Sequence, residues 1–359
     1  MLYKIILSGT KTSGRRRIIA RSRKITILKF FLIGFGAITI LIIGLVIWVY
    51  VSLFAGPGAL ELSDYHPFRS PEAKEKYLRH YDKRAQLWPV SSEIRIVETS
   101  YGQTFVRISG RPDAPPLVLL PGGGSNSLIW RPIIKTLSEG YRTYAVDNIY
   151  DFGRSVYTRS MTTTDDLLMW LDELFDVLEL GDNINLMGLS YGGWLTSQYT
   201  LHAPARVRKV VLLAPASTVL PLSQDFIKRM IISIIPHRYF LKTAVYWSLE
   251  DAVSKNSTCK KFVDEHVEDT YLGLQCFKFK QPPRPTVLRD DEMRSIKKPM
   301  LFLVGENEKI YSAHQAVQRL SNVAPQIETE IIPDCGHDLW IVQKELVTRR
   351  VLEFLKSQD

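Results

Sequence analysis

Short apolar runs alternate with segments of helical periodicity along most of the chain, and this alternation constrains the fold more than any other feature. The runs are short and mostly uncharged, as in the buried strands of a parallel sheet. They lie at 117–120, 143–146, 184–187, 210–213, 300–304 and 330–332. Helical patterns lie among them at 165–180, 194–201, 313–320 and 343–355. Strands that alternate with helices predict an α/β fold, with a mostly parallel central sheet covered by helices on both faces.

Two segments depart from this alternation. N-terminal to the first apolar run, the sequence predicts an amphipathic helix at 70–85 and a β-hairpin in which 94–99 pairs with 104–109. Between 218 and 288 there is no buried-strand run; apolar residues precede Pro236, and a proline cluster at 282–285 closes the segment. We interpret 218–288 as a helical insertion that forms a lid over one end of the sheet. The alternative is a set of extra helices packed on the core.

A glycine–serine motif follows one of the predicted strands. Gly188-Leu189-Ser190-Tyr191-Gly192-Gly193 lies between the strand at 184–187 and the helix at 194–201. Glycines suit a sharp strand-to-helix turn because the backbones pass close together there. Such a turn presents the serine hydroxyl at a helix N-terminus, where main-chain N–H groups point outward. Gly-x-Ser-x-Gly in this context is a nucleophile elbow, which makes Ser190 the candidate nucleophile.

With this motif the chain resembles enzymes of the α/β-hydrolase fold over residues 88–354, and within them bacterial serine carboxylesterases with a glutamate in the catalytic triad. The glycine-rich segment 119–124, with Trp130, resembles the oxyanion loop of this family. The resemblance implies that the N–H groups of Gly123 and Tyr191 form the oxyanion hole. Pro121 stands where the family usually has histidine; because the donors are backbone groups, the hole should persist. The alternative interpretation of segment 119–124 is a plain glycine-rich turn with no catalytic role.

Two further motifs imply the other triad members. The family carries its acid three residues after the glycine that ends a late strand, here Gly305, which implies Glu308, with Glu306 as the alternative. The loop after the last strand, 334–337, implies His337 as the base; Asp334 is too near it in sequence to be the acid. The order serine, acid, histidine is that of these hydrolases. The segment 147–155 resembles another family loop with one glycine missing, and we interpret it as structural.

The resemblance therefore implies a serine hydrolase that cleaves carboxylic esters through an acyl-enzyme. His337 would take the proton of Ser190, and Glu308 would hold the imidazole. No cofactor or metal is expected, because the sequence has neither a His-Glu-x-x-His motif nor a P-loop. Amidase, thioesterase, carbon–carbon hydrolase and perhydrolase activities use the same triad and stay open. The alternative from a different functional class is a non-catalytic binding protein with a hydrolase-like fold.

The N-terminal region predicts a membrane anchor. Residues 30–54 form an uncharged run of 25 residues, long enough to cross a bilayer; a cleaved signal peptide and a buried core helix are the alternatives. Nine basic residues and no acidic ones lie in the first 29. The rest of the chain has 37 basic and 37 acidic residues. The net charge of +9 therefore does not indicate nucleic-acid binding. Because positive residues stay on the cytoplasmic side, we expect a cytoplasmic N-terminus and an extracytoplasmic hydrolase domain.

These observations divide the chain into five parts. They are a basic cytoplasmic tail (1–29), a transmembrane helix (30–54), a linker with an amphipathic helix (55–89), the hydrolase core (90–217 and 289–359) and the helical lid (218–288). The expected partners are a small-molecule ester and the lipid bilayer; the apolar lid and the tether suit lipophilic esters or acylglycerols. Outside the cell, Cys259 and Cys276 could form a disulfide with Cys335 left over, or all three could be free thiols.

Overall fold

The computed structural model describes Gly44 and residues 62–357. The chain divides into two compact units, Met1–Gly58 and Ala59–Asp359, and every strand and helix discussed below belongs to the second. The predicted cytoplasmic tail at 1–29 and membrane span at 30–54 lie outside the described residues, apart from Gly44. None of the helices in the described part of the chain is long and apolar enough to cross a membrane.

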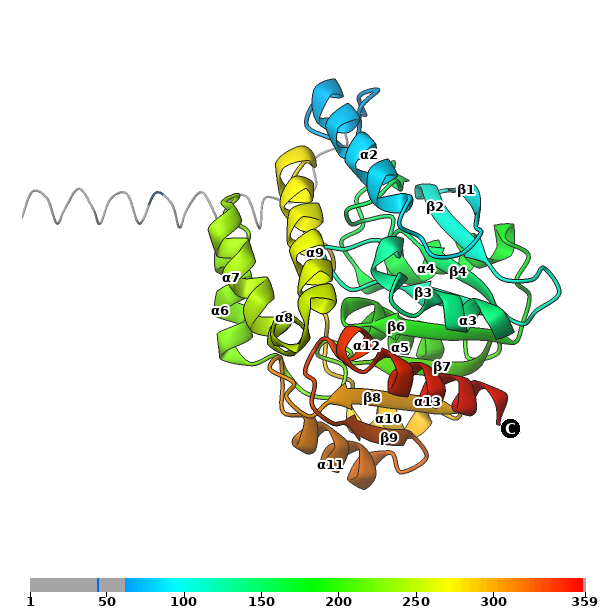
Figure 1. The fold of residues 1–359 in the computed structure, drawn as a ribbon. Helices are drawn as coiled ribbons and strands as arrows, with labels where there is room; N and C mark the ends of the chain where they lie inside the picture. Colours follow the sequence, from blue (N-terminus) through cyan, green and yellow to red (C-terminus); the bar gives the residue numbers. More distant parts are fainter. Residues whose placement is uncertain (1–43, 45–61, 358–359) are drawn as a thin grey trace, which may run out of the picture. The chain divides into compact units, whose positions relative to one another are not determined.

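A nine-stranded sheet forms the centre of the described unit, in the order β1-β2-β4-β3-β6-β7-β8-β9 with β5 paired to β2 (Figure 1). The strands from β4 to β9 along this order are parallel, and β2 is antiparallel to its neighbours. The strands are β1 (Glu93–Thr99), β2 (Gly102–Ser109), β3 (Pro116–Leu120), β4 (Arg142–Val146), β5 (Val156–Tyr157), β6 (Ile184–Leu189), β7 (Val207–Leu213), β8 (Met300–Gly305) and β9 (Glu328–Ile332). The prediction of a mostly parallel α/β sheet is confirmed.

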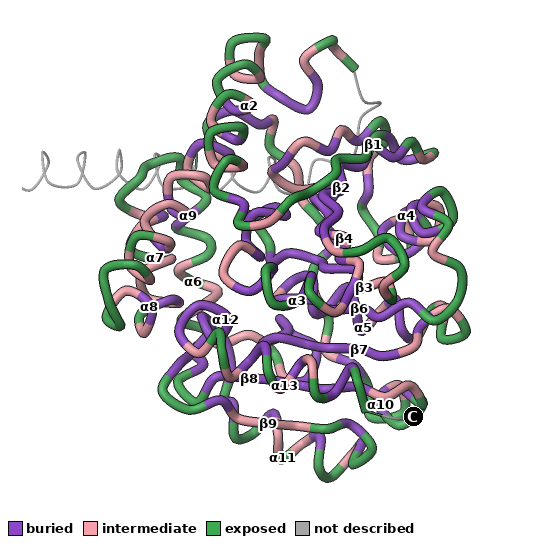
Figure 2. Tube along the Cα trace, turned by 45° about the vertical axis from the view of Figure 1, so that its right-hand side comes forward, coloured by how far each residue is buried: buried purple, intermediate pink, exposed green. Residues whose placement is uncertain are grey.

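Helices cover both faces of this sheet, because successive residues of a strand point to opposite faces. In β7, Val210 and Leu212 face one core cluster, while Val211 and Leu213 face the other. The first cluster contains α4 (Thr164–Val177), α5 (Tyr191–His202), α10 (Asp290–Ser295) and α11 (Ala313–Val323). The second contains α2 (Pro71–Ala85), η1 (Ser127–Trp130), α3 (Ile134–Gly140), α12 (Leu339–Val342) and α13 (Lys344–Lys356). Figure 2 shows the central strand β7 in purple, as buried, whereas the edge strand β9 is mostly intermediate.

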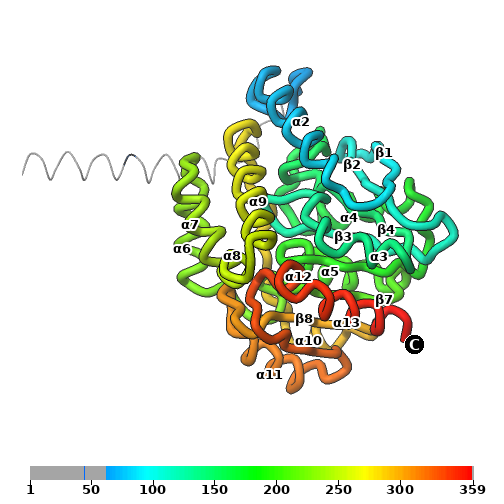
Figure 3. The backbone as a smooth tube through the Cα atoms, viewed as in Figure 1, coloured from blue at the N-terminus to red at the C-terminus, as the bar shows by residue number. Residues whose placement is uncertain are grey.

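The insertion between β7 and β8 is helical, as its sequence predicted. It contains α6 (Gln224–Ser233), α7 (Arg238–Ser248), α8 (Glu250–Lys255) and α9 (Ser257–Cys276). The long α9 packs against α7, α8 and α2, and α6 packs against α7. Figure 3 shows α6 and α7 on the side of α9 that is away from the sheet.

The three cysteines are free thiols. Cys259 and Cys276 lie on the same helix, α9, 17 residues apart. At about 1.5 Å of rise per residue, roughly 25 Å separates them, far beyond the reach of a disulfide. Of the two alternatives that the sequence left open, the structure therefore has the three free thiols.

A buried lysine joins the centre of the sheet to the end of the chain. Lys209 of β7 is 1% exposed. Its ammonium group donates to the main-chain oxygens of Phe354, at 3.0 Å, and Ser357, at 2.7 Å, and to the Ser357 hydroxyl at 2.8 Å. These acceptors include carbonyls at the C-terminal end of α13, where a positive charge is favourable.

Candidate active site

The candidate nucleophile lies at a strained turn between a strand and a helix. β6 ends at Leu189 and α5 begins at Tyr191, so Ser190 is the single residue between them. Ser190 has φ 51° and ψ −114°, a backbone conformation that is uncommon for a residue with a side chain. Its N–H donates to the Leu213 carbonyl at 2.9 Å, and its own carbonyl accepts from Trp194 and Ala216. These hydrogen bonds hold the turn at the carboxyl edge of the sheet.

The glycines of the motif are required because other backbone segments approach them closely. A Cβ on Gly188 would lie 2.2 Å from the carbonyl oxygen of Gly192. A Cβ on Gly192 would lie 2.2 Å from the carbonyl oxygen of Leu120, at the end of β3. Any side chain at either position would displace backbone atoms, so both glycines let the start of α5 pack against the ends of β6 and β3.

The candidate base and acid are hydrogen-bonded to each other. His337 Nδ1 lies 2.9 Å from Glu308 Oε2. The other carboxylate oxygen of Glu308 accepts the main-chain N–H groups of Lys309, at 2.8 Å, and Ile310, at 3.0 Å. The Glu308 side chain is fully buried and that of His337 is 11% exposed. A carboxylate fixed in this way favours the imidazole tautomer that carries its proton on Nδ1.

The environment of His337 favours its protonated form. Burial by itself lowers the pKa of the imidazole, but the charge and hydrogen bond of Glu308, together with the charge of Asp338, outweigh it. The net result is a pKa raised above the ordinary histidine value of 6.5. The site is therefore built to stabilise an imidazolium.

The alternative acid, Glu306, lies elsewhere. Glu306 is exposed, and its carboxylate accepts the main-chain N–H of Asp334 at 3.3 Å. The structure thus brings His337 together with Glu308, and Glu306 supports the loop that leads to His337.

A second buried carboxylate, which sequence reasoning missed, holds the histidine loop. Asp338 is 0% exposed and accepts the N–H of Gly336 at 3.1 Å and that of Ala252, in the first turn of α8, at 2.6 Å. Burial raises the pKa of Asp338 to about 6, although both hydrogen bonds oppose the rise. Asp338 therefore ties the loop of His337 to the helical insertion and caps α8 from outside that helix.

The sheet places the histidine loop near Ser190. The ends of β6, β7 and β8 are in register, with Leu189 paired to Leu213 and Leu213 to Leu303. The loop after β9 reaches back along this edge, because Trp340 Nε1 of α12 donates to the Ile129 carbonyl of η1, beyond the end of β3. The loop that carries His337 therefore lies at the same edge of the sheet as Ser190, with the Gly336 carbonyl against Gly305 at the end of β8.

The two candidate oxyanion residues lie side by side. A Cβ on Gly123 would lie 3.6 Å from the Cβ of Tyr191, and a Cβ on Gly122 would lie 3.5 Å from the Cβ of Ser190. Within residues 62–357, neither the Gly123 N–H nor the Tyr191 N–H has a hydrogen-bond acceptor. The phenol of Tyr191 is held elsewhere, donating to the Pro283 carbonyl at 2.9 Å.

Two side chains fix the residue that follows Gly123. The N–H of Gly124 donates to Asp151 Oδ2 at 2.8 Å, and its carbonyl accepts the hydroxyl of Thr270, on α9, at 3.1 Å. Burial raises the pKa of Asp151 to about 6, against the opposing charge of Lys280. Lys280 donates to the Asp151 main-chain oxygen at 2.7 Å, and burial lowers its pKa to about 8. Neither contact was visible in the sequence.

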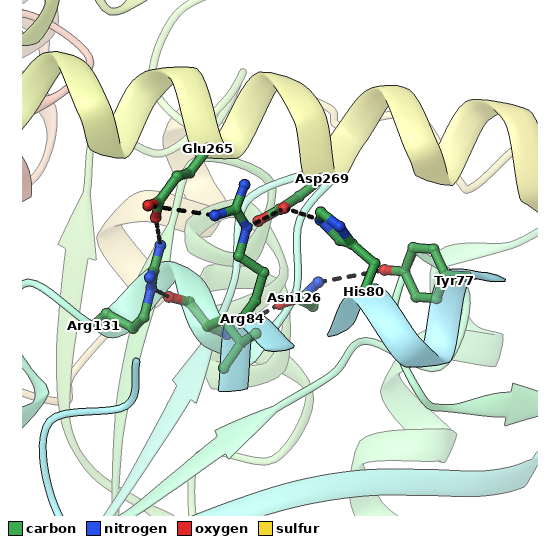
Figure 4. A network of polar contacts seen from close by, with 8 residues as sticks. Tyr77, His80, Arg84, Asn126, Arg131, Glu265 and Asp269 are labelled. Carbon is green, nitrogen blue, oxygen red and sulfur yellow. Dashed lines mark hydrogen bonds and ion pairs between the residues drawn. The ribbon is translucent and has the colours of Figure 1, made fainter. Parts of the chain in front are cut away.

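A network of ion pairs holds α9 in place (Figure 4). Arg84 of α2 contacts Glu265 at 3.3 Å and Asp269 at 2.8 Å, both on α9. Arg131, just after η1, pairs with Glu265 at 2.8 Å, and His80 of α2 lies 2.6 Å from Asp269. The helix that carries Thr270 is thus bound to α2 and to the loop that follows the glycines.

The loop at 147–155 has the internal hydrogen bonds of a structural element. Asp147 is fully buried and accepts the N–H groups of Ser127 and Arg154, both at 2.8 Å, and the hydroxyl of Tyr81 at 3.2 Å.

Among the described residues, no group of three His, Cys, Asp or Glu side chains could hold a metal ion.

Comparison with known proteins identifies the class. The sequence model of the alpha/beta hydrolase fold matches residues 115–343, more than half of the chain. The chain therefore belongs to this family.

Its similar relatives are bacterial enzymes. The chain is 35% identical to the "Uncharacterized carboxylesterase nap" of Bacillus subtilis over 82% of this chain and 97% of that protein, and 33% identical to the carboxylesterase YbfK of the same organism over 82% and 98%. The crystal structure of naproxen esterase (carboxylesterase NP) from Bacillus subtilis matches with a TM-score of 0.73 at 34% identity, covering 83% of this chain and all of that one. These likenesses confirm the prediction of a hydrolase of the carboxylesterase class.

Proposed function

We propose that this protein is a membrane-anchored serine hydrolase that cleaves carboxylic esters with Ser190, Glu308 and His337. The observation that carries the proposal is the 2.9 Å hydrogen bond between His337 and the buried Glu308, at the sheet edge where Ser190 follows β6. A buried carboxylate hydrogen-bonded to an imidazole orients that ring as a general base for a hydroxyl and stabilises its protonated form.

In this proposal the reaction proceeds through an acyl-enzyme. His337 Nε2 accepts the proton of Ser190 as its oxygen attacks the ester carbonyl carbon. Glu308 stabilises the resulting imidazolium, which agrees with the raised pKa of His337. The N–H groups of Gly123 and Tyr191 donate to the oxyanion, a contribution of about 3–4 kcal/mol for each donor. His337 then protonates the departing alcohol, and water, activated by the same imidazole, releases the acid.

The helical insertion and the N-terminal segment suggest the kind of ester. We propose that α6–α9 act as a lid, since Asp338 and Thr270 connect α8 and α9 to the candidate catalytic loops. The uncharged run at 30–54 would anchor the protein, with the N-terminus in the cytoplasm and the hydrolase unit outside. Such an enzyme would meet lipophilic esters or acylglycerols that partition into the bilayer.

A fluorophosphonate probe tests the catalytic proposal, because it labels only an activated serine. We expect labelling and ester hydrolysis by the wild-type protein, and loss of both in Ser190→Ala with an unchanged circular dichroism spectrum. Esterase activity of Ser190→Ala at the wild-type rate would refute the mechanism. A folded wild-type protein that neither takes up the probe nor hydrolyses short-chain esters would favour a non-catalytic role.

A further inference from the structure

Helix α6 and the residues that follow it expose an apolar stripe. Five of the six positions from 230 to 235 carry large aliphatic side chains that are between 40% and 57% exposed, and Tyr239 at the start of α7 is 64% exposed. The aliphatic members are Met230, Ile231, Ile232, Ile234 and Ile235. Together they are a contiguous apolar surface, of a kind that marks a protein or membrane contact.

The last turn of α6 and the residues after it turn apolar side chains to solvent. Met230 and Ile231 lie in that last turn, and Ile234 and Ile235 follow it directly; all four side chains are exposed. The only buried residue of α6 is the polar Ser233. Phe226, near the start of α6, packs against the core, so the exposed apolar surface belongs to the end of the helix and to Ile234 and Ile235 after it.

Basic residues accompany the stripe. Residues 224–243 contain four basic residues and one acidic residue, Asp225. Lys228 pairs with Asp225 and Arg238 with Glu268 of α9, and the other two basic residues are Arg229 and Lys242. Arg229 and Lys242 stack on the rings of Trp247 and Tyr246, both at 4.6 Å, so their stems lie along apolar surface. An outward apolar stripe with a surplus of positive charge is the composition of helices that lie in the interface of an anionic bilayer.

We propose that the stripe, defined as Met230–Ile232, Ile234, Ile235 and Tyr239, docks on an anionic lipid surface. The choice of partner rests on the proposed membrane anchor. The predicted span ends at residue 54, and the described chain begins at 62. Even fully extended, this connection reaches only about 30 Å, which keeps the hydrolase unit next to the bilayer.

A second copy of the chain is a poorer match for this surface. A stable dimer interface involves about 20–30 residues on each side, whereas the stripe has six. A bilayer imposes no such minimum, because an interfacial helix buries one narrow face and gains electrostatic attraction from anionic lipids. Docked in this way, the lid would lie at the surface from which lipophilic esters are taken.

The unit Ala59–Asp359 is suited to a test without the predicted anchor. Both core clusters lie within it, and naproxen esterase, a complete folded enzyme, aligns from end to end within 83% of this chain. We would measure its sedimentation with vesicles of phosphatidylcholine alone and of phosphatidylcholine with about 30% phosphatidylglycerol. Binding should be stronger to the anionic vesicles, and Ile231→Glu with Ile235→Glu should lower the partition coefficient about tenfold or more.

A matched control is Met169→Glu with Val177→Glu on α4. These side chains are 52% and 49% exposed, so the same number of charges replaces equally exposed apolar groups outside the stripe. Partitioning should be unchanged in the control, and hydrolysis of a water-soluble ester should be unchanged in both double variants. Absence of vesicle binding by the wild type, or an equal loss in both double variants, would overturn the proposal. So would concentration-dependent dimers that depend on Ile231 and Ile235 in place of vesicle binding.

The full-length chain separates this inference from the anchor. If residues 30–54 span the bilayer, the full chain remains with the vesicles after alkaline carbonate washing even when it carries Ile231→Glu and Ile235→Glu. Release of the full wild-type chain by that wash would refute the anchor, while binding of the 59–359 unit would still measure the stripe on its own.

Discussion

The contact between His337 and Glu308 is the interaction on which the proposed chemistry depends most directly. We expect Glu308→Gln to lower kcat about 10³- to 10⁴-fold, because an amide cannot stabilise the imidazolium and can favour the wrong tautomer. Glu306→Gln, which alters a carboxylate that touches only the Asp334 N–H, should cost less than about tenfold. Steady-state kinetics of the two variants on one ester provide the test. Equal losses, or a larger loss for Glu306→Gln, would remove Glu308 from the mechanism.

The pKa of His337 predicts the acid limb of the pH–rate profile. Only neutral imidazole accepts the serine proton, and the charge of Glu308 raises the pKa above 6.5. Activity should therefore fall as the pH drops through a midpoint above 6.5. In Glu308→Gln the midpoint of the residual activity should move to lower pH, because the stabilising charge is gone. The profile of kcat/KM on a non-ionisable ester measures both, and an unmoved midpoint in the variant would contradict this assignment.

At the scale of elements, α9 contacts the proposed oxyanion loop. The Thr270 hydroxyl contacts the carbonyl of Gly124, one residue after the proposed donor Gly123. Thr270→Val keeps the shape of the side chain and removes this hydrogen bond. We expect kcat to fall about tenfold with little change in KM, because the donor is needed mainly in the transition state. Thr270→Ser should restore most of the activity.

A similar threonine provides the control for this prediction. Thr243 of α7 is exposed, and its hydroxyl donates to the Phe240 carbonyl of the same helix, at 2.9 Å. Thr243→Val should leave kcat and KM unchanged. If Thr270→Val and Thr243→Val had the same kinetic effect, the contact between α9 and Gly124 would have no role in catalysis.

The elements show which features a sequence can predict. The strands from β3 to β9 were predictable, except for the two-residue β5, because burial on both faces leaves short apolar runs. The elbow at Ser190 was predictable because its residues are consecutive. Asp338, Thr270 and Arg84 were not, since their partners lie 86, 146 and 185 residues away. Nothing in the local pattern around these three residues marks such contacts.

For the whole molecule, the helical insertion is the part where composition predicted the structure but left its orientation open. The apolar residues before Pro236 predicted helix, and α6 is a helix. The same residues gave no sign that those at the end of the helix would point to solvent, because amphipathic periodicity is identical for a face turned to the core and one turned outward. Only the burial of Ser233 and the exposure of Ile231 and Ile235 reveal the direction.

The buried Lys209 links the middle of the sheet to the final residues of the chain. Its ammonium group donates to Phe354 and Ser357, which the ribosome adds about 145 residues later. While the chain is still being synthesised, β7 carries a charged amine without these carbonyls, and burying it then would be costly. The carbonyl acceptors of this buried amine are therefore complete only after synthesis has reached Ser357. A stop codon that removed the last turn of α13 would take these acceptors away and lower the stability of the fold, although it would delete none of the proposed catalytic residues.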